Sequence, residues 1–112
     1  MTPLKLIETD SGKYSLLLIA GETGVDEVIY ELGHEPNGYF WAGIAELLVE
    51  HEAPDLGERF SYDPEAGMFC ARGTDRAALA ELGELMSGAA TDADRLRALV
   101  ALAAATGFEF DD

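Results

Sequence analysis

Residues 33–52, with the sequence GHEPNGYFWAGIAELLVEHE, change from a loop to a helix within a few positions, and this change constrains the fold most. Pro36 removes a backbone donor and Asn37-Gly38 is a strong turn dipeptide, which predicts a shaped loop. A positive φ at position 38 would explain why glycine, Gly38, occurs there. Apolar side chains then recur at spacings of three and four, as on one buried face of a helix. The residues assigned to this face are Phe40, Ile44, Leu47, Leu48 and His51.

The same helix has a second side with a different character. Tyr39, Glu46 and Glu50 project from it, and Gly43 lies between them. Trp41 is one position from the apolar face, and tryptophan is largely buried in most proteins, so we expect it to be mainly structural. The helix therefore combines a core anchor with an acidic aromatic surface.

Turn residues and hydrophobic periodicity predict two hairpins, each followed by two helices. This order indicates an α+β fold with a mostly antiparallel sheet of about four strands and the helices packed on one face. At 112 residues the chain is expected to form one domain, residues 1–112. The expected strands are 4–9, 14–20, 59–63 and 68–72, and the expected helices are 25–32, 39–53, 74–85 and 91–106.

The last two helices and the tail carry more specific expectations. Thr74 and Thr91 are candidate N-caps, and Ser87-Gly88 is expected to end the third helix. Phe108 and Phe110 could hold the C-terminal tail against the body. The two final aspartates, Asp111 and Asp112, are then expected to be solvated.

The chain carries 22 acidic and 7 basic residues, a net charge of −15, and this speaks against binding nucleic acid or anionic membranes. The acids are unevenly placed, because ten lie between Tyr14 and Glu58 without a single Lys or Arg. A block of one sign speeds encounter with a basic partner. The alternative is a solvated acidic surface with no partner.

The single cysteine, Cys70, cannot form an intrachain disulfide, which fits a reducing compartment. No signal peptide pattern is present and no apolar run is long enough to span a membrane. We therefore expect a cytoplasmic protein.

Known catalytic and cofactor motifs do not occur in the chain. The two histidines, His34 and His51, are 17 residues apart and do not form the HExxH pair of zinc proteases. Cys70 lies in an apolar strand, where a free cysteine usually acts as a small hydrophobic residue. The sequence predicts no metal, no cofactor and no enzyme activity. The alternative is a small enzyme or ligand-binding domain that uses the loop of residues 33–39.

The segments GHEPNGYFWAGIAELL and YDPEAGMFCA resemble the bacterial polymorphic-toxin immunity family called Immunity protein 51. The most distinctive positions are Gly33, His34, Gly38, Tyr39 and Trp41. The resemblance implies an α+β domain and a non-enzymatic antitoxin that binds and neutralises a cognate toxin.

Charge and resemblance together suggest a surface for that toxin. We expect Tyr39, Glu46 and Glu50 to contact it, with Glu27 and Glu31 of the preceding helix in support. Nuclease toxins bind polyanions and tend to be basic, so an acidic inhibitor could occupy their substrate surface. The chain is expected to be a monomer or a weak homo-oligomer. A structural subunit that associates through Trp41 is a further possibility.

Overall fold

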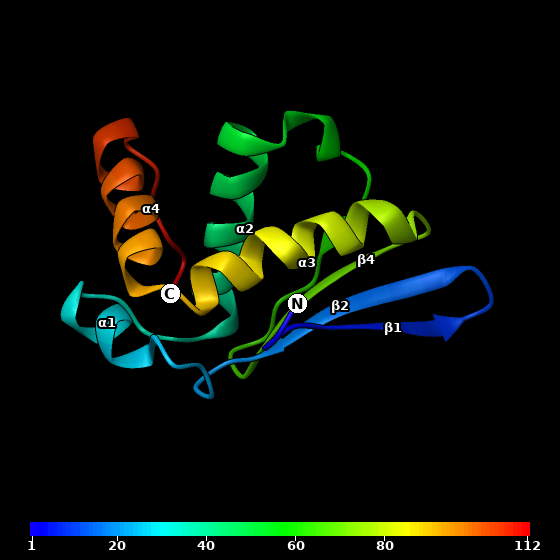
Figure 1. Cartoon of the computed structure of the whole chain (residues 1–112), viewed down its shortest axis with the longest axis horizontal. Helices are drawn as coiled ribbons and strands as arrows, with labels where there is room; N and C mark the ends of the chain where they lie inside the picture. The colour runs from blue at the N-terminus through cyan, green and yellow to red at the C-terminus, as the bar shows by residue number, and fades with distance from the viewer.

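The computed structural model describes all 112 residues, and its elements follow the order expected from the sequence (Figure 1). Each of two hairpins is followed by two helices, and a short 3-10 turn, η1 (Pro54–Leu56), joins the halves. The elements are β1 (Lys5–Asp10), β2 (Lys13–Ile19), α1 (Asp26–Glu31), α2 (Gly38–Glu52), β3 (Ser61–Tyr62), β4 (Met68–Gly73), α3 (Arg76–Ala90) and α4 (Ala93–Thr106).

One antiparallel sheet with the strand order β1-β2-β4-β3 joins the two hairpins. Helices α2 and α3 pack on one face of it and α4 packs against them, so the expected α+β architecture is confirmed (Figure 1). Leu16 and Leu18 of β2 face the helices together with Phe69 and Ala71 of β4, and all four are fully buried. β2 is an inner strand, which explains its apolar character. Alternate residues of β2 and β4 face the side of the sheet that carries no helix.

The third strand and two helix ends differ from the sequence expectation. β3 is only two residues long, and Arg59, expected at its start, lies outside it and donates to the carbonyl of Asp55 and the carboxylate of Asp75. Thr74 and Thr91 do not cap their helices. Aspartates one residue later do so, since a carboxylate accepts backbone N–H bonds readily. Their side chains accept from Ala78 N and from Asp94 N and Arg95 N, respectively; the caps are Asp75 and Asp92.

Ser87-Gly88 does not end α3, which continues to Ala90. Ala89 and Ala90 are buried, so core packing sustains the last turn despite the helix-breaking glycine. The Ser87 hydroxyl donates to the carbonyl of Thr2 (2.6 Å), which ties this turn to the N-terminus.

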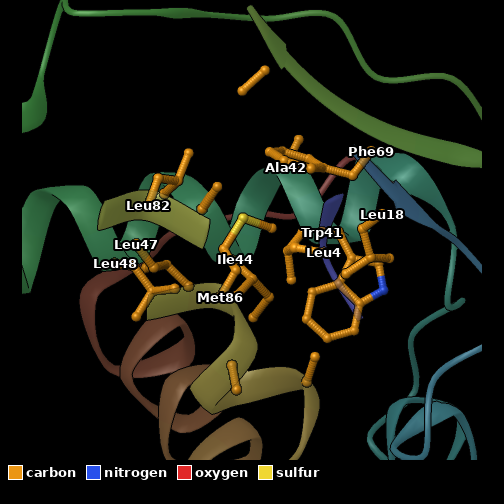
Figure 2. Close-up of a cluster of buried hydrophobic side chains, with 14 of the residues drawn as sticks. Leu4, Leu18, Trp41, Ala42, Ile44, Leu47, Leu48, Phe69, Leu82 and Met86 are labelled. Atoms are coloured by element: carbon orange, nitrogen blue, oxygen red, sulfur yellow. The ribbon is translucent and has the colours of Figure 1, made fainter. Parts of the chain in front are cut away.

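Helix α2 supplies the centre of the core, as Figure 2 shows. Trp41 has none of its surface exposed, which rules out an oligomer interface formed through it. His51 is exposed, so its expected place on the buried face is wrong, because that face ends with Leu48. The fully buried side chains of α2 are Phe40, Trp41, Ile44, Ala45, Leu47 and Leu48.

The N-terminus of α2 lies directly against the turn between β3 and β4. The Gly38 amide donates to the carbonyl of Ala66 at 3.0 Å. A Cβ on Gly38 would overlap the backbone oxygens of Glu65 and Met68. Gly38 does not have a positive φ, so the suggested explanation is wrong. Close approach of two backbones requires glycine here.

We expect Gly38→Ala to lower the free energy of unfolding by more than about 1 kcal/mol, because rigid backbone must move to admit the methyl group. The matched control is Gly88→Ala, also in a helix, where a Cβ meets nothing within 4 Å. Gly88→Ala should leave stability unchanged or raise it by about 0.5–1 kcal/mol. Chemical denaturation measures both. Equal effects of the two substitutions would contradict the close-approach explanation.

Candidate functional site

The C-terminal tail packs on the side of α2 that carries Tyr39 and Glu46. A Cβ on Gly43 would lie 2.5 Å from Cδ1 of Phe110, so the absence of a side chain at Gly43 makes room for that ring. Phe110 stacks on Phe40 with ring centroids 4.9 Å apart. Phe108 contacts Phe110 edge-on at 5.2 Å. The expectation that these two phenylalanines hold the tail to the body is confirmed.

The end of the tail is bound to the loop before α2. The carboxylate of Asp112 lies 3.0 and 3.1 Å from Nδ1 of His34 and accepts the Glu35 amide at 2.8 Å. Only 9% of the Asp112 side chain is exposed, so its expected solvation is wrong, whereas Asp111 is exposed. The loop turns at Gly33, where φ is 84°. The polar groups of this loop are thus largely engaged in contacts within the chain.

A pocket of about 160 Å³ opens between α2, the β3–β4 hairpin and this tail. Three of its lining residues are acidic and none is basic, although they come from two distant parts of the chain. The lining residues are Tyr39, Ala42, Gly43, Glu46, Tyr62, Pro64, Phe108, Glu109 and Asp111.

Burial and neighbouring negative charge both raise the pKa values of groups in the pocket. Partial burial raises the pKa of the Glu46 carboxyl, and the negative charges of Asp111 and Glu50 raise it further. Burial likewise raises the pKa of the Tyr62 hydroxyl, and Glu46 adds to that shift. No base lies among these groups to neutralise them. The pocket therefore presents uncompensated negative charge.

The structure separates the five expected contact residues into two sets. Tyr39, which is 38% exposed, and Glu46 line the pocket, and Glu50 is exposed one turn further along α2. Glu27 and Glu31 lie on α1 and do not line it. Glu31 contacts the guanidinium of Arg97 on α4 at 3.4 Å.

Sequence reasoning missed the residues that the tail and the hairpin contribute. Glu109, Asp111, Tyr62 and Pro64 all line the pocket. The acids at the chain end were a usable signal, but nothing in the sequence indicated which face the tail covers. Glu52, counted in the acidic block, is also paired, in its case with Arg95.

The other groups considered from the sequence lie apart from one another. His51 is exposed at the end of α2, whereas His34 contacts Asp112. Cys70 is buried in β4. No group of three or more His, Cys, Asp or Glu side chains is arranged to hold a metal ion. None of the helices has the length and apolar character to cross a membrane.

The family model described as Immunity protein 51 matches residues 4–105. The chain belongs to the Immunity protein 51 family. Membership gives it an antitoxin role in general terms, which implies binding of a cognate toxin and suggests a non-enzymatic protein. No curated protein and no solved structure matches the chain significantly. In this Immunity protein 51 chain the match includes all of α2 and ends before the tail residues that close the pocket.

The ionisation of Glu46 provides a test of the pocket geometry. Asp111→Asn should lower the Glu46 pKa toward its ordinary value, because one repulsive charge is removed, while burial maintains part of the shift. The control is Glu109→Gln, a pocket acid that is not among the causes of that shift. Carboxyl NMR titration of the folded protein measures both variants.

The raised pKa also fixes a sign for stability. The contribution of Glu46 to folding is fully present below its ordinary pKa and is lost as the pH rises through the higher folded value. Asp111→Asn should therefore reduce the loss of stability over that interval. An unchanged Glu46 pKa in Asp111→Asn would show that the tail does not lie beside α2 in solution.

Proposed function

We propose that the protein neutralises its cognate toxin through an acidic face formed by Tyr39, Glu46 and Glu50 of α2 with Glu109 and Asp111 of the tail. The observation that carries this proposal is the pocket that holds three carboxylates and no base. Family membership supports the antitoxin part of it. Neither family membership nor the fold by itself indicates which face of the protein binds the toxin.

The chemistry of the pocket favours a basic side chain as its occupant. An ammonium or guanidinium group would replace repulsion between Glu46 and Asp111 with two attractive contacts. Tyr39 and Tyr62 add rigid aromatic walls, and aromatic anchors surrounded by charge are common at the centre of tight interfaces. The occupant is thus a lysine or arginine of the toxin.

The remaining acids serve association more than affinity. Glu50 is exposed near the pocket, and Glu27 and Glu31 are exposed on α1. Because Glu31 is paired with Arg97, it contributes less than Glu27. Exposed acids of this kind steer a basic partner toward the interface. A nuclease toxin fits, since its own surface is complementary to a polyanion.

The antitoxin function is tested by co-expression with the product of the adjacent upstream gene. We expect that product alone to stop growth and growth to recover when this protein is present. A purified mixture should give a stable complex on size-exclusion chromatography. If the upstream product is harmless, or if this protein neither binds it nor restores growth, the proposed pairing is wrong.

The acidic face is tested by binding kinetics with the purified toxin. Glu46→Lys with Glu50→Lys should slow association and weaken its salt dependence, whereas Tyr39→Ala should raise the dissociation rate and cost about 2 kcal/mol or more. The control with the same change of charge is Glu81→Lys with Glu84→Lys on α3. Equal effects of the two charge reversals would show that only net charge matters, and the location of the interface would then be wrong.

A further inference from the structure

The face of the sheet that carries no helix holds a second, chemically opposite pocket. Its volume is about 480 Å³, and it lies toward the β1–β2 turn. Two lining residues are basic and none is acidic, in a chain whose acids outnumber its bases by 22 to 7. Five others carry hydroxyl groups. The lining residues are Thr9, Lys13, Tyr14, Ser15, Ser61, Arg72, Gly73 and Thr74.

Strand register places the central donors of this pocket side by side. Ser15 of β2 pairs with Arg72 of β4, and Arg72 pairs with Ser61 of β3. Residues in register on neighbouring strands project from the same face of a sheet. Since Leu16 and its alternates face the helices, this row faces the opposite side. The Arg72 side chain thus leaves the sheet between Ser15 and Ser61, and its guanidinium contacts Asp63.

Several of these donors have no partner within the chain. Ser15 is only 5% exposed, and its hydroxyl makes no hydrogen bond to another protein group although it lines the pocket. Trp41 Nε1, in the core, is the buried side-chain polar atom without a partner, whereas the Ser15 hydroxyl is accessible from the pocket and is free to bond a ligand there. Lys13 forms no ion pair. Ser61 and Thr74 likewise donate to no protein group.

The acids around the pocket are already engaged. Asp63 contacts Arg72 at 2.9 Å and so holds that side chain in place. Asp75 caps α3 and pairs with Arg59. Glu8 and Asp10 accept backbone amides within the β1–β2 turn at 3.2 and 2.9 Å. These acids therefore have partners within the chain, and Lys13 is the charged lining residue that has none.

We propose that this pocket binds the phosphate group of a small phosphate monoester. Such a group carries a charge of about −1.5 to −2 at neutral pH, and Lys13, which forms no ion pair, is the cation free to balance part of it, since Asp63 is paired with Arg72. Its three terminal oxygens accept bonds from Arg72, Lys13 and the hydroxyls, the donor types that bind phosphate in proteins. The pocket also has room for more than phosphate alone, since ligand pockets are commonly about 300–1,000 Å³.

A nucleic acid fits this pocket poorly. The site offers two basic residues, whereas binding a polyanion requires neutralising many phosphates. The net charge of −15 repels an extended polyanion over the whole surface. A small dianion has one charged group and experiences this repulsion at a single place on the surface. Salt also screens charges that lie more than about 8 Å away.

The site is independent of the proposed acidic face. The acidic pocket lies beside α2, on the helix side of the sheet, and the two pockets share no lining residue. Phosphate binding can therefore fail while toxin binding succeeds, and the reverse.

The test is NMR titration of the full chain with inorganic phosphate and with glycerol 3-phosphate, using glycerol as the uncharged control. We expect saturable shifts at the amides of Ser15, Ser61 and Thr74 with both phosphates and none with glycerol. Lys13→Gln should weaken binding about tenfold, as expected for loss of a charged hydrogen bond. Lys5→Gln should change it less than about twofold, because Lys5 projects from the same face outside the pocket.

Ser61→Ala provides a second variant, because Ser61 is exposed and its substitution leaves the core intact. It should weaken both phosphates with an unchanged unfolding temperature. Shifts that do not saturate, or equal losses in Lys13→Gln and Lys5→Gln, would overturn the proposal. So would tighter binding of a short single-stranded oligonucleotide at the same amides than of either phosphate.

Discussion

The contact between the first turn of α2 and the β3–β4 turn determines how the rest of the molecule is arranged. Gly38 permits the two backbones to touch, and its amide bonds Ala66. With the helix start held there, Phe40, Ile44 and Leu48 enter the core over β4. As a result, Tyr39 and Glu46, on the other side of the helix, lie at the sheet edge beside Tyr62. One close approach thus orients both the core and the acidic side of α2.

The tail adds a second layer to this arrangement. Phe110 fills the space that Gly43 leaves on α2, and Asp112 binds the loop that precedes the helix. The tail brings Glu109 and Asp111 into the same pocket as Glu46, whose pKa is raised by burial and further by the charge of Asp111. The cost of that repulsion is what a basic partner would relieve. Gly38 and Gly43 of α2 therefore shape the site, because the absence of a side chain at each lets another segment pack closely.

The two pockets, on opposite sides of the sheet, differ in the charge of their lining residues. Arg95 and Arg97 of α4 pair with Glu52 and Glu31, so part of the acidic block is neutralised inside the molecule. Glu46, Glu109 and Asp111, which line the pocket beside α2 and the tail, form no ion pair. Lys13 and Arg72 face the other way, from the side of the sheet without helices. The two proposed sites would let a strongly acidic protein bind a cationic group on one side of the sheet and an anionic group on the other.

The sequence by itself determined the order and type of the elements, because periodicity, turn residues and caps act over a few neighbouring residues. It also placed Tyr39 and Glu46 on the polar side of α2. Only the tertiary structure decided the strand order, the reason for Gly38, the burial of the Asp112 carboxylate and the contribution of Glu109 and Asp111 to the pocket. These features depend on contacts between segments far apart in the chain. No local pattern encodes such contacts, since they follow from how the helices, sheet and tail pack together.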